Sequence, residues 1–312
     1  MPLFARRLSL LAVLTAVALL LCPGGAEIRA AANAPGSRTV QIGSLQRYRV
    51  KGGESLVEIA RRFDLGFNSL VAANPGIDPW VPGNGTSVTL PTSFILPLVQ
   101  GRPAIVINIP EFRLYFFPRS TNARVRTFPL GIGEQGRTTP AGDYTVIEKI
   151  VHPVWHVPAS IRAENRYGSA VVPPGPENPL GSHALRLSRN DLLIHGTNRP
   201  YGIGRRTSHG CLRLYPEDIV TLFRLVAPGT TVRIIDEPVK ACRIGNRILL
   251  EAHPPVAGTI SVGDALRLLA RKRLLTRVDF GKVVRVIEEK RGVPLDVTLA
   301  LSDELGKMQG AR

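Results

Sequence analysis

Residues 192–214 read LLIHGTNRPYGIGRRTSHGCLRL, and the rest of the chain is organised around this stretch. Its apolar start, Leu192 to Ile194, predicts a buried strand that ends at His195. A loop rich in Gly and Arg then returns the chain to four residues: Ser208, His209, Gly210 and Cys211. The stretch therefore predicts that a thiol and two imidazoles lie close together.

A cysteine and a histidine placed in this way are the minimum set for acyl transfer. A thiol is a nucleophile as its thiolate, and a neighbouring imidazole lowers the thiol pKa and carries its proton. Gly210 has no side chain, so a substrate carbonyl can approach Cys211 closely. The backbone N–H groups of Gly210 and Cys211 are then candidates to bind the oxyanion that forms on attack.

Several spaced motifs agree, in order, with one known family. After His195-Gly196 comes the run Ser208 to Leu214, and four segments precede it: Ile107-Asn108-Ile109, Leu114-Tyr115, Gly131-Ile132-Gly133 and Thr138-Thr139-Pro140-Ala141-Gly142-Asp143-Tyr144. Residues 102–236 therefore resemble the catalytic domain of the L,D-transpeptidases of the YkuD type, which make cross-links in bacterial peptidoglycan. The resemblance implies a mostly β catalytic domain, with curved, sandwich-like β-sheets and flanking helices.

The resemblance also implies roles for the residues of the stretch. Cys211 is the expected nucleophile, and His195 is the expected proton donor and acceptor, oriented by the backbone carbonyl of Gly196. Gly210 is expected to supply an oxyanion N–H. The other polar residues of the motif are expected to bind substrate: Thr207, Ser208, His209 and Arg213. For the arginine, a salt bridge that braces the turn is an equally open reading beside a bidentate hold on a substrate carboxylate.

The implied reaction is a two-step acyl transfer that uses no cofactor and no metal. Cys211 attacks the diaminopimelate carbonyl of a tetrapeptide stem, releases D-Ala and keeps the rest of the stem as a thioester. Three acceptors stay open: the amine of a neighbouring stem, which gives a 3→3 cross-link, a lysine of a lipoprotein, and water. The family also implies that carbapenems acylate the same cysteine.

Three other classes of function compete with this interpretation. His195, His209 and Cys211 are zinc ligands by type, but the sequence shows no fourth ligand at metal spacing. A pure peptidoglycan-binding protein is disfavoured by the intact histidine and cysteine. A cysteine endopeptidase or carboxypeptidase of the cell wall is the nearest alternative, although wall endopeptidases place the cysteine before the histidine in the chain.

The N-terminus predicts export. Arg6 and Arg7 precede the apolar run Leu8 to Leu21, and small residues follow up to Ala26, which indicates a signal peptide over residues 1–26. The run is shorter than the ~20 residues that span a bilayer as a helix. Lipidation of Cys22 stays open but is disfavoured, because Leu21 stands where lipid attachment requires a small residue.

The charge agrees with a place in the cell envelope. The chain has 40 Lys and Arg against 24 Asp and Glu, a formal net charge of +16. Exported basic proteins are drawn to anionic envelope polymers. Nucleic acid is not an expected partner, because no base-reading helix or aromatic stacking platform appears. We expect the periplasm, or more generally the cell envelope, with peptidoglycan as the partner and a lipoprotein as a further acceptor.

A second unit precedes the catalytic one, after a small, polar linker over residues 27–45. Residues 46–92 predict a strand over 47–50, a helix over 56–63 capped by Ser55, a helix over 68–73 capped by Asn68, and a strand over 86–91. This order resembles a LysM module, on three motifs: Tyr48-Arg49-Val50-Lys51-Gly52-Gly53-Glu54-Ser55-Leu56, Ala73-Asn74-Pro75 and Val88-Thr89-Leu90-Pro91. LysM modules are small α+β units that bind N-acetylglucosamine-containing glycans, so the resemblance implies an anchor on glycan strands.

The body of the catalytic unit predicts strands over 104–109, 113–117, 128–132, 143–150 and 231–235, and an amphipathic helix over 216–226. The first two strands form a hairpin across Pro110-Glu111. Residues 152–181 are rich in Pro and lack periodicity, so we expect them to cover the substrate groove.

Residues 237–312 form a partly helical C-terminal tail with no recognisable chemistry. A hairpin is predicted over 239–254, and helices over 263–274 and 280–289. Cys242 in this hairpin is expected to be a buried or partly buried thiol without a catalytic role. Pairing of Cys242 with Cys211 in an oxidising compartment stays open, and it would inactivate the nucleophile.

Overall fold

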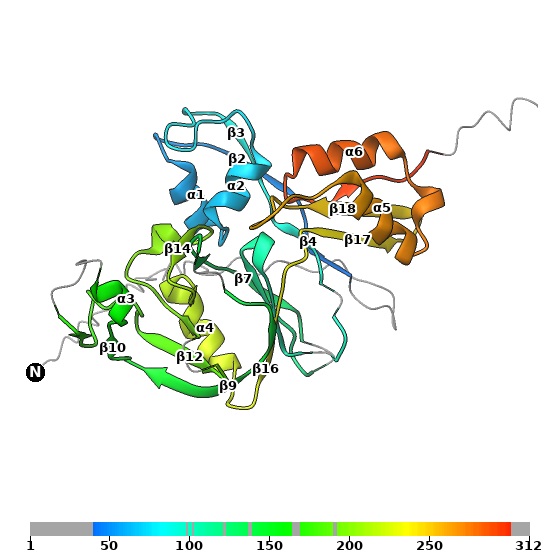
Figure 1. Ribbon diagram of the computed structural model, residues 1–312. Helices are drawn as coiled ribbons and strands as arrows, with labels where there is room; N and C mark the ends of the chain where they lie inside the picture. Colours follow the sequence, from blue (N-terminus) through cyan, green and yellow to red (C-terminus); the bar gives the residue numbers. More distant parts are fainter. Residues whose placement is uncertain are drawn as a thin grey trace, which may run out of the picture.

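The computed structural model describes residues 40–97, 99–101, 103–120, 123–136, 139–163, 169–189 and 192–300. The predicted signal peptide, Cys22 and most of the predicted linker lie outside these residues, as do Arg102 and Thr138. Figure 1 shows an N-terminal unit, a central unit and a C-terminal unit that pack against one another. Within the described residues, no helix has the length and hydrophobicity needed to span a membrane.

The N-terminal unit has the predicted strand, helix, helix, strand order. β2 (Gln46–Arg49) pairs antiparallel with β3 (Ser87–Leu90), and α1 (Leu56–Arg62) and α2 (Phe67–Ala73) share a core with them. The predicted cap of the first helix is confirmed. The Ser55 hydroxyl accepts the N–H of Glu58, and the Glu58 carboxylate accepts the N–H of Ser55. This reciprocal pair satisfies N–H groups that the first helical turn leaves unbonded.

Helix α2 begins at Phe67 with Gly66 at its N-cap, so the prediction of an Asn68 cap is wrong. The first two N–H groups of the helix donate instead to the carbonyls of Ile203 and Gly204 in the central unit. These long-range bonds replace a side-chain cap. They require close approach, because a Cβ on Gly204 would lie 2.2 Å from the nitrogen of Phe67. The N-terminal unit therefore rests directly on the loop that leads to the cysteine.

The central unit is built on an eight-stranded sheet in the order β15-β13-β12-β9-β16-β5-β6-β7. Its strands in chain order are β5 (Ile105–Asn108), β6 (Arg113–Phe116), β7 (Arg126–Pro129), β9 (Gly142–Val151), β12 (His183–Leu187), β13 (Leu193–His195), β15 (Leu212–Arg213) and β16 (Thr231–Ile235). The predicted hairpin is confirmed, since β5 and β6 pair antiparallel across the 3-10 turn η1 (Ile109–Glu111). β16 runs parallel to β5 and antiparallel to β9 in the middle of the sheet.

The sheet curls, and its two ends are joined (Figure 1). Gly131, which follows β7, exchanges two backbone hydrogen bonds with Arg213 of β15. The strand predicted over 128–132 is therefore divided: β7 ends at Pro129, and the separate strand β8 (Ile132–Gly133) pairs with β14 (Arg206–Ser208). The division brings the chain after β7 alongside the segment that carries Cys211.

Helix α4 (Pro216–Leu225) agrees with the prediction to within one residue and packs against the sheet. Ile219 and Leu222 of the helix are fully buried in one core with Ile194 and Leu212. A Cβ on Gly196 would lie 3.0 Å from the Ile219 side chain, so the helix fits tightly behind the end of β13.

The segment predicted to be irregular contains three short elements, β10 (Trp155–His156), α3 (Ala159–Arg162) and β11 (Val171–Val172). The fully buried Asn178 organises its end, since its amide donates to the carbonyls of Pro153, Val172 and Pro173. That this segment covers a substrate groove stays a prediction.

The C-terminal unit contains the predicted hairpin and both predicted helices. Its elements are β17 (Val239–Ile244), β18 (Arg247–Ala252), α5 (Val262–Arg271), η3 (Leu275–Arg277), α6 (Phe280–Glu289) and β19 (Leu295–Asp296). The three strands, α5 and α6 share a separate core. Next to this unit, β1 (Gln41–Gly43) pairs with β4 (Ser93–Ile95).

A buried ion cluster joins the C-terminal unit to the central unit. The ammonium group of Lys240 lies 2.8 Å from Glu111 of η1 and 2.9 Å from Glu251 of β18, and it also donates to the carbonyl of Ile95. All three charged side chains are at most 3% exposed. Buried charges of this kind are tolerated when they are paired and hydrogen-bonded, as here.

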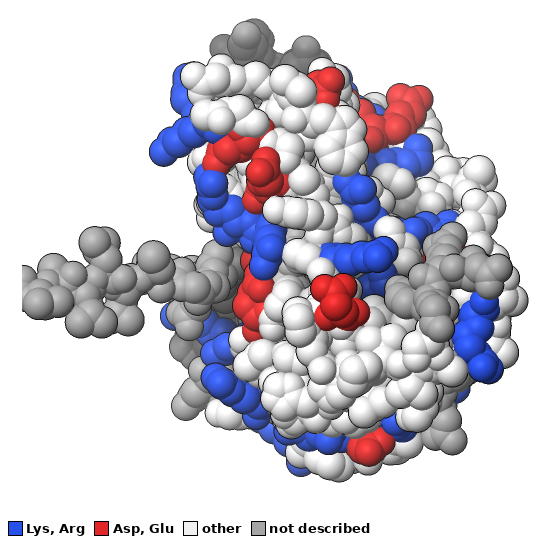
Figure 2. All heavy atoms as spheres, turned by 90° about the vertical axis from the view of Figure 1, so that its left-hand side faces the viewer, with Lys and Arg blue, Asp and Glu red and all other residues white. Residues whose placement is uncertain are grey.

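Surface charges are mixed on the face shown in Figure 2. Lys and Arg side chains are spread over this face, and Asp and Glu lie between them. The arrangement agrees with a positive charge distributed over a solvated surface.

Candidate active site

Strand β13 delivers His195 to the site. Ile194 is fully buried, and the strand lies between β12 and β15, where His195 pairs with Ala184 on one side and with Arg213 on the other. Cys211 immediately precedes β15, and Ile194 is level with Leu212 in this parallel pairing, so Cys211 lies on the neighbouring strand, two residues behind His195 in register. The topology thus places the two ends of the stretch on neighbouring strands.

The backbone fixes the tautomer of His195. Its Nδ1 lies 2.7 Å from the carbonyl oxygen of Gly196. A carbonyl oxygen only accepts, so Nδ1 carries the hydrogen and the neutral ring keeps its lone pair on Nε2. The carbonyl of Gly196 therefore occupies the orienting position that the resemblance implied.

His195 is held neutral by its surroundings. Burial, and then the nearby positive charge of Arg213, lower the pKa of His195 from 6.5 to about 3, against the opposing effect of the Gly196 and Leu180 carbonyls. The imidazole is 3% exposed. A neutral ring at ordinary pH is the form that can accept a proton from a thiol.

Cys211 is half-buried and forms no disulfide, whereas Cys242 is buried in the C-terminal unit. Burial raises the pKa of the Cys242 thiol to about 11, with Glu251 adding to the effect. Its side chain packs with Ile95 and Leu249. The expectation that the Cys242 thiol is buried is confirmed, and the two cysteines belong to different units.

Ser208 supports the turn around the cysteine. Its side chain is 1% exposed, and its hydroxyl donates to the carbonyl of Cys211 at 2.5 Å and accepts the N–H of Gly210 at 3.3 Å. The Ser208 hydroxyl and the Gly210 N–H are therefore bonded to each other in this structure. Their expected roles, in substrate binding and at the oxyanion, stay predictions.

The other predicted substrate-binding residues lie around this turn. The Nε2 of His209 is 3.6 Å from the carboxylate of Glu134, and the hydroxyl of Thr207 donates to the carbonyl of Gly202. Arg213 is half-buried, and its charge acts on His195. The structure thus brings all of them to the site, and direct contact with a substrate stays a prediction.

Thr139 also lies in the site, although no role for it follows from the sequence alone. Its side chain is 7% exposed, its hydroxyl donates to the carbonyl of Gly210 at 2.9 Å, and it accepts the N–H of Gly133 at 3.4 Å. The feature of the sequence that points to Thr139 is its place in Thr138-Thr139-Pro140, one of the motifs that carry the family resemblance.

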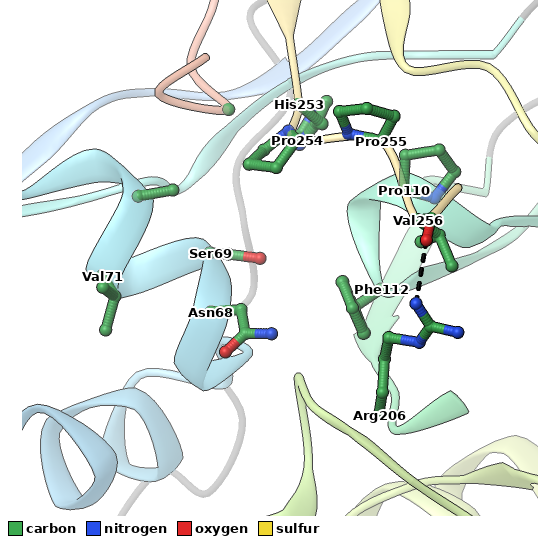
Figure 3. A pocket seen from close by; sticks show the side chains of 12 residues that line it. Asn68, Ser69, Val71, Pro110, Phe112, Arg206, His253, Pro254, Pro255 and Val256 are labelled. Atoms are coloured by element: carbon green, nitrogen blue, oxygen red, sulfur yellow. Dashed lines mark hydrogen bonds between the residues drawn. The ribbon is translucent and has the colours of Figure 1, made fainter. Parts of the chain in front are cut away.

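A cavity of about 390 Å³ lies beside the site, where the three units meet (Figure 3). Asn68 and Ser69 of α2 line one side, and Phe112 and the His253 to Val256 segment line the other. Arg206 links the cavity to the site, because its guanidinium donates to the carbonyls of Val256 at 2.8 Å and of Gly133 at 3.4 Å. The cavity is mostly apolar, and neither Cys211 nor His195 lines it.

The residues with metal-ligand geometry lie elsewhere. Within the described ranges, the side chains whose ligand atoms come within 4.8 Å of one another are Glu111, Glu251 and His253, and this group does not include the cysteine. The ammonium of Lys240 already lies between the two carboxylates. A positive charge at this position disfavours a bound cation.

Comparison with known proteins agrees with both resemblances. Residues 102–234 match the model of the L,D-transpeptidase catalytic domain (YkuD), and residues 48–79 match the model of the LysM domain.

Three relatives cover most of the chain. The "Probable L,D-transpeptidase YcfS" of Escherichia coli is 39% identical over 277 residues, which are 84% of this chain and 86% of the relative. The "Probable L,D-transpeptidase YbiS" of E. coli is 43% identical over 66% of this chain and 68% of the relative. The "Probable L,D-transpeptidase ErfK/SrfK" of Salmonella typhimurium is 37% identical over 78% and 83%. With this identity over most of both chains, and with His195 on β13 and Cys211 at the start of the neighbouring strand β15, the chain belongs to the L,D-transpeptidase family.

Proposed function

We propose that this enzyme is a cysteine-dependent L,D-transpeptidase that acts on the tetrapeptide stems of peptidoglycan. The observation that supports this most directly is the contact of His195 Nδ1 with the Gly196 carbonyl, which leaves Nε2 as the base. The half-buried Cys211 immediately precedes β15, the strand that pairs with the strand of His195.

The first step forms an acyl-enzyme. The thiol proton of Cys211 passes to Nε2 of His195 as sulfur attacks the diaminopimelate carbonyl, and an oxyanion forms. The intermediate collapses, the C–N bond to the terminal D-Ala breaks, and the leaving amine takes the proton from Nε2. The stem then remains on sulfur as a thioester.

The second step releases the stem. The acceptor amine gives a proton to Nε2 of His195 and attacks the thioester, and the leaving sulfur regains that proton. The acceptor is the amine of a neighbouring stem or a lysine of an outer-membrane lipoprotein, and water as acceptor gives a carboxypeptidase. No cofactor enters either step. Carbapenems acylate Cys211 through the same attack.

The place of the reaction follows from the other segments. Residues 1–26 direct export to the periplasm, and the LysM module holds the enzyme on glycan strands. The matched LysM model and the net charge of +16 support an anchor on the envelope polymer.

The test is intact-protein mass spectrometry of the mature chain with a carbapenem, beside Cys211→Ala and Cys242→Ala. A mass adduct that disappears in Cys211→Ala alone, together with D-Ala release from a disaccharide-tetrapeptide, is the expected result. An adduct that survives in Cys211→Ala, or none on the reduced protein, would overturn the proposal. Product analysis with a second stem, a lysine peptide or neither then identifies the acceptor.

A further inference from the structure

We propose that Thr139 is a positioning residue for the oxyanion, because it fixes the direction of the Cys211 N–H through the carbonyl of Gly210. The proposal rests on the acyl-transfer function of Cys211 proposed above. It gives a task to the motif Thr138-Thr139-Pro140, which the proposed mechanism leaves without one.

The Thr139 hydroxyl has a fixed orientation. It has one hydrogen, which it donates to the Gly210 carbonyl at 2.9 Å, and its oxygen accepts the N–H of Gly133 in β8 at 3.4 Å. At 7% exposure the side chain is shielded from solvent. Because the hydroxyl oxygen is bonded to a strand N–H, the hydroxyl can hold the carbonyl to which it donates in a definite direction.

The geometry of the peptide bond carries this direction to the cysteine. The Gly210 carbonyl and the Cys211 N–H belong to the same planar trans peptide, so they point in opposite directions. A hydrogen bond that holds the carbonyl towards Thr139 therefore holds the N–H away from it. The nucleophile's own N–H lies next to the carbon that its sulfur attacks, which is the usual place of an oxyanion donor.

The neighbouring peptide is fixed from the other side. The Ser208 hydroxyl accepts the N–H of Gly210 and donates to the carbonyl of Cys211. Gly210 has a φ of 112°, in the region that favours glycine, so this turn depends on outside support to keep its shape. The Gly210 N–H is directed to Ser208 and the Gly210 carbonyl to Thr139, so the peptides on both sides of Gly210 have a fixed direction.

The test separates oxyanion stabilisation from thiol reactivity. Thr139→Val has nearly the same shape and lacks the hydroxyl, and Thr139→Ser keeps it. Each variant is acylated with p-nitrophenyl acetate, which forms an oxyanion, and alkylated with iodoacetamide, which forms none. Each is also assayed for kcat and KM of D-Ala release.

We expect Thr139→Val to acylate about 10- to 100-fold more slowly, below the full cost of about 10²- to 10³-fold for removing an oxyanion donor. The alkylation rate of Thr139→Val should stay within about twofold of that of wild type. Its loss in D-Ala release should appear in kcat rather than in KM. Thr139→Ser should recover most of the acylation rate. Equal losses of alkylation and acylation, or no loss of either, would overturn the proposal. Because p-nitrophenyl acetate is attacked by any accessible thiolate, this comparison remains valid if wild type fails to release D-Ala, a result that would contradict the proposed function alone.

Discussion

The carboxyl groups of Asp64 and Asp218 share a hydrogen bond across the contact between the LysM module and helix α4. Burial raises the pKa of both groups, and that of Asp218 rises well above its ordinary value because the charge of Asp64 adds to the effect. Arg113 opposes both shifts, and Glu217 adds to them. Two acids in such contact retain a proton between them at pH values where exposed carboxyl groups have lost theirs.

This pair makes the module contact sensitive to pH. The folded chain binds more protons than the unfolded chain above about pH 4, so the contribution of the pair to stability is complete below that pH and is lost as the pH rises through the raised pKa. Asp218→Asn supplies a permanent hydrogen-bond donor. Its melting temperature should therefore fall less than that of wild type between about pH 5 and about pH 8. Glu217→Gln, at the exposed neighbouring position, is the control, and parallel curves for Asp218→Asn and wild type would contradict the prediction.

Arg213 should lower the pKa of His195, the base in the proposed mechanism. Replacing it by Gln removes a positive charge that destabilises imidazolium, so the pKa of His195 should rise from about 3 while burial still keeps it below 6.5. The measurement is the ¹³Cε1 shift of labelled histidine against pH, assigned with His195→Gln. A wild-type midpoint near the ordinary value, or a downward shift in Arg213→Gln, would show that the charge does not act on the ring.

Lys240 should be essential for the contact between the central and C-terminal units. Lys240→Met leaves Glu111 and Glu251 buried without their cation, a change that costs about 3–5 kcal/mol in comparable cases. Lys282→Met, on the exposed face of α6, is the matched control and should change the free energy of unfolding by under ~0.5 kcal/mol. Chemical denaturation of the full chain provides both values, and equal effects of the two substitutions would contradict a special role for Lys240.

Removal of the Lys240 side chain should also allow the buried group of Glu111, Glu251 and His253 to bind zinc. In Lys240→Ala the ammonium is gone, and the remaining group of Glu111, Glu251 and His253 has its ligand atoms within 4.8 Å of one another. Zinc should then raise the melting temperature of the variant and leave that of wild type unchanged. A similar response of both proteins would show that zinc binds elsewhere.

Gly204 should be intolerant of any side chain. Its φ is +79° and a Cβ would lie 2.2 Å from the Phe67 nitrogen, so Gly204→Ala should separate α2 from the loop and expose the junction to protease. Gly85→Ala is the matched control, because its φ of +81° gives the same backbone strain with nothing within 4 Å. Limited proteolysis should cut Gly204→Ala faster than Gly85→Ala, and equal rates would mean that only backbone strain matters.

Local patterns in the sequence predicted the parts of the fold that local interactions determine. The Ser55 cap, the hairpin across Pro110-Glu111 and the strand before His195 all follow from neighbours within a few positions. The position of Cys211 beside His195 followed from the order of the motifs, and the sheet pairing agrees with it.

Contacts between residues far apart in the chain could not be predicted from these local patterns. The wrong cap at Asn68 arose because the partners of α2 are carbonyls in another unit. Thr139 and Gly210 are 71 positions apart, and Glu111 and Lys240 are separated by an even longer stretch of the chain, so no periodicity links either pair. The motif shows that Ser208 is near the cysteine, but it does not give the direction of the Ser208 hydroxyl, which donates to the Cys211 carbonyl.

The contact of α2 with the carbonyls of Ile203 and Gly204 limits which modules could replace the N-terminal unit of this protein during evolution. A glycan-binding module joined only by a flexible linker can be replaced by another without consequence for its neighbour. Here the incoming module would have to present a glycine before its second helix and leave two helical N–H groups for the loop. Recombination of the module with unrelated catalytic domains is thereby restricted to partners that carry the complementary loop.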